Sequence, residues 1–358
     1  MWTVIAEVSE EATRVSGIAD VARLAGVSKS TASRALSGSG YVSPATRERV
    51  TSAAVALGYV PSTNAQSLAT GRTQNVGVVM PYVNRWFFAE VLEGIQSALL
   101  ERGLDLTLYD ATPGSDRRRR IFDDFLARKR FDGLIAVGLE PQEDELDRML
   151  SFGKPVVSVI GSSPRTSVVT IDDEDAAGRA TGHLLALGHT RIVFLGGGAG
   201  ASDHHVEASR VRGYREAMAE AGLAHEVRHL PATLSMPDGY AAAVDLLSDP
   251  RERPTAIVAA CDEVAIGAMV AARRLGIQVP AGLSIIGIDD HEYADMFALT
   301  TMQQIPREQG ATAVELLIRQ IEDPAAEVVD VVLKPRLVVR SSTAPLGRGA
   351  VPRIDAAG

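Results

Sequence analysis

Four polar side chains near the N-terminus lie on one predicted face of a short helix. Lys29, Ser30, Ser33 and Arg34 have spacings that bring them to the same side of a helix over residues 29–36. An arginine on such a face can form two hydrogen bonds with guanine, which discriminates between bases by about 1–3 kcal/mol. Ordinary helical hairpins can have the same spacing, so the pattern favours base reading in a DNA groove but leaves a structural role open.

We expect a helix, a glycine turn and a second helix to hold this polar face in place. Apolar residues recur on one side of residues 18–24, which is typical of an amphipathic helix. Gly26 follows where a tight turn needs a positive φ angle, and Ser28 is a good N-cap for the helix over residues 29–36. This arrangement predicts a helix-turn-helix, whose second helix would enter the major groove of DNA.

A third helix and a linker are predicted after this pair. Ser43 followed by Pro44 indicates a helix start, and Gly58 ends the helix predicted over residues 44–57. In the next segment, residues 61–74, the stretch 62–69 could form two turns of helix, but it has no apolar stripe wide enough to pack on a larger body. Because so short a helix is unstable alone in water, we expect this linker to fold only on a partner.

From residue 76 onward, apolar strand-like runs alternate with helical stretches. Continuous apolar strands joined by helices predict parallel sheets that are covered on both faces. The number of units favours two doubly wound sheets, so we predict an α/β protein with a small all-α domain followed by a two-lobed domain. Ligands of such folds bind at the carboxyl ends of strands. Strands are predicted at residues 76–80, 104–109, 133–137, 156–160, 168–171, 192–195, 256–259, 283–288 and 299–302.

Charge is distributed unevenly along the chain. Residues 18–72 hold six basic and two acidic side chains, a net charge of +4, whereas residues 73–358 carry 29 basic and 40 acidic ones, a net charge of −11. The net charge of the whole chain is −9, so nucleic-acid-binding charge does not cover the protein. The asymmetry fits a small DNA-facing module on an acidic body.

Cysteine content and hydropathy favour a cytoplasmic protein. A single cysteine, Cys261, cannot form an internal disulfide and is expected to be a small buried residue. No apolar run approaches the roughly 18 residues that a membrane-spanning helix needs. Residues 1–16 include glutamates and lack the apolar segment of a secretory signal, so we expect the cytoplasm.

No set of residues suggests catalysis, a cofactor or a metal centre. The glycine-rich run at residues 194–200 lacks the full phosphate-loop spacing and has no following lysine, so we interpret it as a loop after a strand. The histidines show no metal-ligand spacing, and no nucleophile stands out beside a base. The chain is therefore predicted not to be an enzyme.

Residues 18–28, 43–50 and 57–61 closely resemble the LacI family of transcriptional regulators. These segments read IADVARLAGVS, SPATRERV and LGYVP, and the resemblance continues from residue 76 to about residue 343. It implies a helix-turn-helix DNA-binding domain joined to a sensor domain with the fold of periplasmic sugar-binding proteins. It also implies a repressor whose operator affinity is controlled by a small-molecule effector, which we expect to be a sugar.

The resemblance implies three kinds of DNA contact. Base edges in the major groove would be read directly, phosphate contacts would position the protein, and an apolar wedge would enter the minor groove and bend the duplex. Gln66 and Ser62 depart from the arginine and asparagine that are common in the family at these positions. This departure weakens the expectation for individual minor-groove contacts but not for DNA binding as a whole. The implied residues are Lys29, Ser30 and Arg34 for bases, Thr31, Ser33, Arg47 and Tyr59 for phosphates, and Leu68 with Ala65 for the wedge.

The resemblance also implies effector contacts between two lobes that hinge around the ligand. Carboxylates and a guanidinium can form paired hydrogen bonds with vicinal hydroxyls, while aromatic rings cover an apolar face. Each residue has a structural alternative. The aromatic rings could be plain core and Gln304 structural, whereas Asp172 could be only a helix cap, Arg210 a surface ion pair and Asp289 a turn residue. The implied set is Phe87, Phe88, Asp172, Arg210, Asp289 and Gln304.

Some predicted pocket positions leave the effector undecided. Cys261 is an unusual occupant of a family pocket position, Leu234 stands where several sugar-responsive members carry an aromatic residue, and Ile160 stands where some carry a polar one. One alternative is a nucleobase or nucleoside corepressor on the same fold. Another is a sugar-binding receptor without a DNA role, which the absence of a signal peptide and the presence of a reader both oppose.

We expect two such chains to form a homodimer on a pseudo-palindromic DNA operator. The sequence decides neither the sign of the effector response nor whether dimers pair into tetramers. The expected organisation is a flexible N-terminus at 1–16, a helix-turn-helix domain at 17–60, a hinge helix or linker at 61–74, an effector-binding domain at 75–345 and a flexible tail at 346–358. Within the effector-binding domain, one lobe would comprise about 75–173 and 305–332, and the other about 174–304 and 333–345.

Overall fold

The computed structural model describes residues 17–38, 40–59, 71–128, 130–161, 163, 165–198 and 205–347. The chain divides into two compact units, the first made of residues up to Asn75 together with Arg130–Asp132, and the second of the rest. Each unit is described by itself. Within the described ranges, no helix combines the length and the apolar character needed to cross a bilayer.

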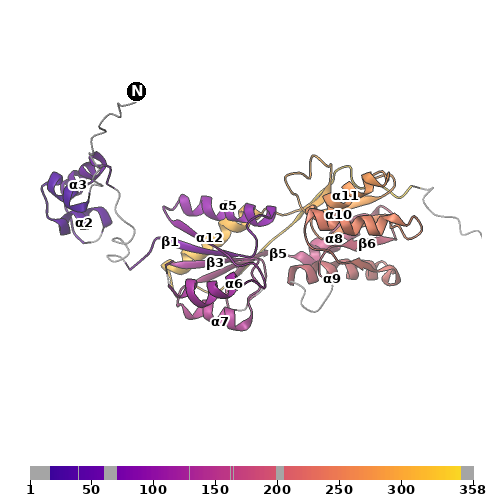
Figure 1. Cartoon of the computed structure of the whole chain (residues 1–358), viewed down its shortest axis with the longest axis horizontal. Helices are drawn as coiled ribbons and strands as arrows, with labels where there is room; N and C mark the ends of the chain where they lie inside the picture. The colour runs from indigo at the N-terminus through magenta and orange to yellow at the C-terminus, as the bar shows by residue number, and fades with distance from the viewer. Residues whose placement is uncertain are drawn as a thin grey trace, which may run out of the picture. The chain divides into compact units, whose positions relative to one another are not determined.

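Among its described residues, the first unit contains three short helices: α1 (Ile18–Ala25), α2 (Lys29–Ser37) and α3 (Pro44–Ala56) (Figure 1). Their ends carry the expected capping interactions. The Ser28 hydroxyl accepts a hydrogen bond from the Thr31 amide at 3.2 Å, and the Ser43 hydroxyl accepts one from the Thr46 amide at 3.3 Å. Gly26 turns the chain between α1 and α2 with a φ angle of 66°. The predicted helix-turn-helix is therefore present.

The core of this unit is built almost entirely from small side chains. Alanines at the crossing points of the helices allow their backbones to approach closely, and Val27 packs against them from the turn. This leaves one face of α2 without any role in packing. The buried residues are Val21, Ala22, Ala25, Ala32, Ala35, Val50, Ala53 and Ala54.

The second unit contains two six-stranded sheets, as the alternation of strands and helices predicts. The first has the order β11-β5-β4-β3-β1-β2, and the second has the order β12-β10-β9-β8-β6-β7. The strands of the first are β1 (Asn75–Met80), β2 (Asp105–Asp110), β3 (Gly133–Val137), β4 (Val156–Val159), β5 (Ser167–Ile171) and β11 (Asp330–Leu333). Those of the second are β6 (Ile192–Leu195), β7 (Arg228–Leu230), β8 (Ala256–Ala259), β9 (Ser284–Asp289), β10 (Thr300–Gln303) and β12 (Arg336–Val338).

Pairing between the central strands is parallel in both sheets. The edge strand β12 differs, because it runs antiparallel to β10. Parallel central strands that are buried on both faces explain why the sequence shows continuous apolar runs rather than alternation. The expected doubly wound α/β architecture is confirmed.

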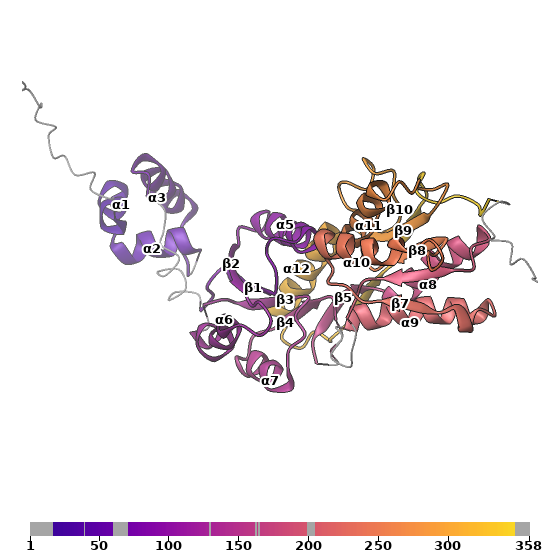
Figure 2. The same cartoon turned by 45° about the vertical axis from the view of Figure 1, so that its right-hand side comes forward.

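Helices cover the faces of each sheet and define two lobes. The N-lobe is the first sheet with α5 (Trp86–Leu100), α6 (Asp116–Arg120), α7 (Glu143–Ser151) and α12 (Pro306–Glu322). The C-lobe is the second sheet with α8 (Asp173–Ala186), α9 (His205–Glu220), α10 (Met236–Ser248) and α11 (Asp262–Arg274). In the N-lobe, α5 and α12 lie on one face of the sheet and α6 and α7 on the other (Figure 1). In the C-lobe, α10 and α11 lie on one side and α9 on the other (Figure 2).

Within the described chain, three segments pass from one lobe to the other. They lie between β5 and α8, between β10 and α12, and between β11 and β12. The first two leave the carboxyl ends of parallel strands, where ligands of doubly wound folds bind. Residues in these two segments are therefore placed to contact a ligand between the lobes.

Glycines allow the helix pairs on each lobe to pack closely. A Cβ atom on Gly94 of α5 would lie 2.1 Å from the carbonyl oxygen of Arg307 on α12. A Cβ atom on Gly213 of α9 would lie 2.0 Å from the carbonyl oxygen of Glu174 on α8. Both distances are far below van der Waals contact, so neither position accepts a side chain without the helices moving apart.

Candidate nucleic-acid interface and ligand cleft

The outward face of α2 carries the side chains predicted to read bases. Lys29, Ser30 and Arg34 are exposed, whereas Ala32 and Ala35 point into the core. The Arg34 Nε atom donates a hydrogen bond to the Ser30 carbonyl oxygen at 3.2 Å, so the guanidinium lies along the helix surface. Guanidinium, ammonium and hydroxyl groups on one exposed helix face can hydrogen-bond base edges.

The predicted phosphate-contacting residues lie beside this face but are less exposed. Thr31 and Ser33 on α2 are half-buried, and so is Tyr59, which packs against the helical core. Arg47 of α3 donates to the Ala35 carbonyl oxygen of α2 at 3.4 Å, so it also ties these two helices together. The predicted wedge residues Ala65 and Leu68 lie outside the described residues.

A cleft of about 1340 Å³ opens between the N-lobe and the C-lobe. Both lobes line it with a mixture of charged, amide and aromatic side chains, which is the composition expected of a site for a polar small molecule. Of the predicted effector contacts, five lie in its wall. These are Phe87, Phe88, Arg210, Asp289 and Gln304.

Arg210 is the charged centre of the cleft wall. Its side chain is almost completely buried, and Nε donates to the Asp173 carboxylate at 2.8 Å while Nη1 donates to the Ala260 carbonyl oxygen at 2.5 Å. Burial alone would lower the pKa of Arg210, but Asp173 and Asp289 raise it, so the guanidinium stays charged. The surface ion pair considered for Arg210 is thus a buried one.

Asp289 stands at the end of β9 with a φ angle of 133°, a conformation that side-chain-bearing residues rarely adopt. Its carboxylate accepts a hydrogen bond from the Gln304 amide at 2.6 Å. Burial raises the pKa of Asp289 to about 6, although Arg210 opposes the rise. The backbone therefore holds a partly desolvated carboxylate against the cleft at the end of a strand.

Asp172 is not in the cleft wall, and the adjacent Asp173 takes the expected place. Asp172 is exposed, and its carboxylate caps α8 by accepting from the Asp175 amide at 2.9 Å. Asp173 is the buried partner of Arg210 and lines the cleft. The structure thus matches the helix-cap alternative for Asp172, because α8 begins at Asp173, directly after Asp172.

Aromatic rings form part of the N-lobe side of the cleft. The Phe87 and Phe88 ring centroids lie 5.7 Å apart at an interplanar angle of 87°, and the Tyr82 ring lies 5.8 Å from Phe88 at 72°. Adjacent rings are therefore nearly perpendicular and do not form a parallel pair. Leu234, Ile160 and Cys261 also line the cleft, and burial raises the pKa of the Cys261 thiol well above its usual value.

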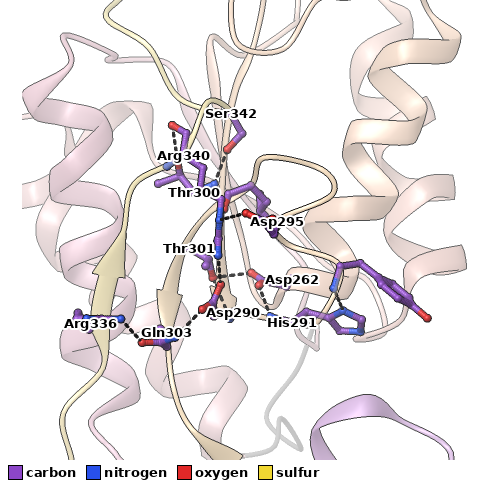
Figure 3. A network of polar contacts seen from close by, with 12 residues as sticks. Asp262, Asp290, His291, Asp295, Thr300, Thr301, Gln303, Arg336, Arg340 and Ser342 are labelled. Carbon is purple, nitrogen blue, oxygen red and sulfur yellow. Dashed lines mark hydrogen bonds and ion pairs between the residues drawn. The ribbon is translucent and has the colours of Figure 1, made fainter.

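A second buried carboxyl group, Asp262, lies on α11 beside the cleft wall. It lies in the first turn of that helix, directly after the N-cap residue Cys261. Asp262 accepts hydrogen bonds from the Thr301 hydroxyl at 2.7 Å and from the His291 amide at 2.9 Å (Figure 3). Burial, with a contribution from the nearby Asp289, raises the pKa of Asp262 to about 8. The same network continues through Arg340, which lies 2.8 Å from Asp290.

Sequence reasoning missed several cleft residues, three of which stand near the start of a helix. Gln309 is fully buried on α12, Trp86 begins α5, and Glu263 lies in the first turn of α11. All three stand in the first turn or two of a helix, where their direction depends on the residue at which the helix begins. A sequence signal existed for Glu263, because it lies four residues after the end of the strand predicted at residues 256–259.

The histidines and the glycine-rich loop show no ligand-binding geometry within the described ranges. His189 is buried and bonded to the Thr255 hydroxyl and the Ala344 carbonyl oxygen, both at 3.0 Å, so its role is structural. No cluster of potential metal ligands occurs among the residues that the structure describes. In the loop after β6, the Gly198 amide donates to the Glu207 carboxylate at 2.7 Å.

Comparisons with known proteins agree with this architecture. Residues 17–62 match the family described as "Bacterial regulatory proteins, lacI family", and residues 181–343 match the "Periplasmic binding protein-like domain". The HTH-type transcriptional repressor PurR of Vibrio campbellii (strain ATCC BAA-1116) is 34% identical over 338 residues, which cover 92% of this chain and 99% of the repressor.

Two solved structures extend the comparison. The transcriptional regulator CelR–cellobiose complex is 31% identical, with a TM-score of 0.66, and the match covers 91% of this chain and 99% of that one. The lac repressor dimer bound to operator and the anti-inducer ONPF is 26% identical, with a TM-score of 0.80, over 92% of this chain and 100% of that one. These relatives are transcriptional regulators, which confirms that the protein is a DNA-binding regulator and not an enzyme. The chain belongs to the LacI family of bacterial regulatory proteins.

Proposed function

We propose that the protein is a homodimeric repressor whose affinity for a pseudo-palindromic operator is controlled by a sugar bound between the N-lobe and the C-lobe. One observation carries the effector part: the Arg210–Asp173 ion pair and the Asp289–Gln304 hydrogen bond both lie in the wall of the cleft, and Asp289 contributes to raising the pKa of Arg210. Such planar, paired groups suit the vicinal hydroxyls of a sugar.

The DNA part rests on the exposed face of α2. Lys29, Ser30 and Arg34 would contact base edges, with Arg47 and Tyr59 beside them on the phosphates. Thr31 and Ser33 would add further phosphate contacts. Ala65 and Leu68 in the linker would enter the minor groove. The lac repressor dimer that resembles this chain is described as bound to operator, which supports the same assembly here.

The sugar is favoured over other ligands by the chemistry of the wall and by one relative. Carboxylates, a guanidinium and amides dominate the part of the cleft around Arg210, and the similar CelR structure is a complex with cellobiose. A nucleobase corepressor is the second candidate, because Phe87 and Phe88 offer ring faces on which a base could stack. The two candidates differ in ligand but share the site.

Effector and operator would be coupled through the angle between the lobes and through folding of the linker at residues 61–74. Coupling free energies of about 1–3 kcal/mol are usual for such systems, which corresponds to a change in operator affinity of roughly 5- to 150-fold. A sugar that weakens linker folding would act as an inducer. A ligand that strengthens it would act as a corepressor.

Operator titration tests this function. DNA selected from random duplexes, or taken from upstream of the protein's own gene, should bind more tightly than a scrambled duplex by a factor of at least about 10³. A binding sugar should change that affinity, and Asp289→Ala should leave an operator-bound protein that no longer responds. Equal weak binding to every duplex would contradict the proposal.

A further inference from the structure

Gln309 ends a chain of amide hydrogen bonds that begins at the Asp289 carboxylate. Asp289 accepts from the Gln304 amide nitrogen at 2.6 Å, and the Gln304 amide oxygen accepts from the Gln309 amide nitrogen at 2.8 Å. The chain crosses from the C-lobe, which holds Asp289, to α12 of the N-lobe, which holds Gln309. All three side chains line the cleft and are buried.

The direction of this chain is fixed by Asp289. An ionised carboxylate only accepts hydrogen bonds, so Gln304 must turn its NH₂ group toward it. The Gln304 oxygen then faces Gln309, which must in turn present its own NH₂ group. The Gln309 oxygen is left at the end of the chain as an acceptor, and it is buried with no partner among the described residues.

An unpaired buried acceptor costs roughly 1–3 kcal/mol, so a bound molecule that donates a hydrogen bond there gains affinity. On the same side of the cleft, the Trp86 indole Nε1–H is a buried donor that also lacks a partner among the described residues. A hydroxyl group both donates and accepts. The cleft therefore offers the two kinds of unpaired group that hydroxyls satisfy.

The arginines of the cleft are already engaged, which bears on the charge of the ligand. Arg118 forms paired bonds to Glu145 at 2.7 and 2.8 Å, and Arg119 bonds Asp116 at 2.6 Å. Arg148 is paired with Asp123 and Asp144. Arg210 is paired with Asp173, and the Arg85 guanidinium lies 3.8 Å from the centre of the Tyr82 ring.

Carboxylates, in contrast, remain available in the cleft. Glu263 accepts no hydrogen bond from the described residues, and burial raises its pKa. Asp289 uses only one oxygen for Gln304. A phosphate or carboxylate on the ligand would meet these acceptors. To find a cation, it would have to break an existing ion pair or draw Arg85 away from the Tyr82 ring.

We propose that Gln309 contacts the effector by accepting a hydrogen bond from one of its hydroxyls, and that the effector is an uncharged, polyhydroxylated molecule. This assignment rests on the proposed effector-controlled function. It excludes sugar phosphates and nucleotides. The perpendicular Phe87 and Phe88 rings offer a nucleobase one ring face at most and not a parallel pair.

Calorimetric titration of the full-length protein tests the proposal. The probes are cellobiose, ribose and other neutral sugars, glucose 6-phosphate and ribose 5-phosphate, and hypoxanthine and guanine. We expect a neutral sugar to bind and its phosphorylated counterpart to bind at least tenfold more weakly. Binding by only the phosphorylated probes or nucleobases, or by no neutral sugar, overturns the assignment.

Gln309→Met tests the residue itself, since methionine keeps the length of the side chain and removes both polar groups. We expect the dissociation constant for the neutral sugar to rise about tenfold. Monodeoxy analogues of that sugar each lack one hydroxyl. At least one of them should bind the wild type more weakly than the parent sugar does. The same analogue should bind Gln309→Met as tightly as the parent sugar binds Gln309→Met. An unchanged affinity of Gln309→Met for the parent sugar, or analogues that lose affinity equally in both proteins, overturns the contact.

Gln320→Leu is the matched control, because Gln320 lies on the same helix α12 and bonds Ser167 at 2.8 Å outside the cleft. This variant should bind the sugar as the wild type does. If Gln320→Leu weakens sugar binding as much as Gln309→Met, the effect belongs to the helix and the contact is overturned. Failure of the unliganded wild type to select an operator would contradict the proposed function instead, so the two failures are distinguishable.

Discussion

Replacing Asp262 by asparagine should stabilise the sensor unit at neutral and alkaline pH. Asp262 is fully buried and accepts hydrogen bonds from Thr301 and His291. An asparagine of the same shape can keep both contacts, with its oxygen accepting from the His291 amide and its NH₂ group donating to the Thr301 oxygen. The substitution therefore removes an ionisable group without opening a cavity, and it reverses the hydrogen bond with Thr301, whose hydroxyl donates to Asp262 in the wild type.

The size of the effect follows from the pKa. Because burial raises the pKa of Asp262 from 3.8 to about 8, the folded state holds this proton more tightly than the unfolded chain. The contribution of Asp262 to stability is therefore greatest below pH 4, falls as the pH rises through the interval up to about 8, and is constant above it. Each pH unit in that interval lowers the free energy of unfolding by at most about 1.4 kcal/mol, and the whole interval lowers it by at most about 6 kcal/mol. Local rearrangement around the ionised carboxylate relieves part of this cost, so we expect the free energy of unfolding to fall by about 3 kcal/mol over the whole interval.

Urea unfolding at pH 5, 7 and 9 measures the difference. Of the two tryptophans in the chain, a Trp2→Phe background leaves Trp86 of the N-lobe as the only fluorescent reporter. Between pH 5 and 9, which covers most but not all of that interval, the wild type should lose about 2 kcal/mol more stability than Asp262→Asn. Asp245→Asn, an exposed position on α10, should follow the wild type. Identical pH dependence in wild type and Asp262→Asn would refute a raised pKa at Asp262.

Three further outcomes follow from other contacts. Arg34→Ala should reduce the preference for operator over scrambled duplex by roughly 5- to 150-fold in a fluorescence anisotropy titration, because one bidentate base contact is lost; an unchanged preference would remove Arg34 from the reading face. Arg210→Met should lower the free energy of unfolding by about 3–5 kcal/mol and abolish effector binding in calorimetry, because Asp173 loses its buried counter-charge. Gly94→Val should cost about 3 kcal/mol in urea unfolding, because its Cβ would overlap the Arg307 carbonyl oxygen; an unchanged midpoint would mean that α5 and α12 are not packed this closely.

The elements predicted best from the sequence are those whose signals are local. Ser28 and Ser43 cap the helices that they were expected to cap, and the strands at residues 133–137, 192–195 and 256–259 agree with the structure residue for residue. A helix cap depends only on the residues in the first turn of that helix, and a strand buried on both faces must be apolar throughout. Neither depends on how distant parts of the chain fold.

Elements at the margins of the sheets could not be predicted in this way. β7 reads Arg-His-Leu and β12 reads Arg-Leu-Val, and both are edge strands with exposed or half-buried positions. Edge strands need no continuous apolar run, so their sequences resemble loops. The start of α10 carries a local signal instead, since Ser235 caps the helix that begins at Met236 and Pro237 stands at its second position.

The same difficulty explains the error at Asp172. Two adjacent carboxylates follow β5, and only the position at which α8 begins decides which of them caps the helix and which turns inward. A helix beginning at Asp173 makes Asp172 the cap and buries Asp173 against Arg210. Gln309 could not be identified for a related reason, because its importance depends on Gln304 and Asp289, which come from other elements.

The cleft residues also occupy the segments that connect the lobes. Asp173 begins α8 directly after the crossing that follows β5, and Gln304 lies in the crossing between β10 and α12. A ligand that orders the hydrogen bonds of Asp173, Asp289 and Gln304 therefore restrains the same backbone that must bend when the lobes close. A third crossing, between β11 and β12, contributes no residue to the cleft wall. We therefore expect the effector to act on the angle between the lobes through two of the three connections. A substitution in the third connection, such as Lys334→Gly, should change how strongly the effector alters operator affinity. It should change the affinity for the effector itself by a smaller factor.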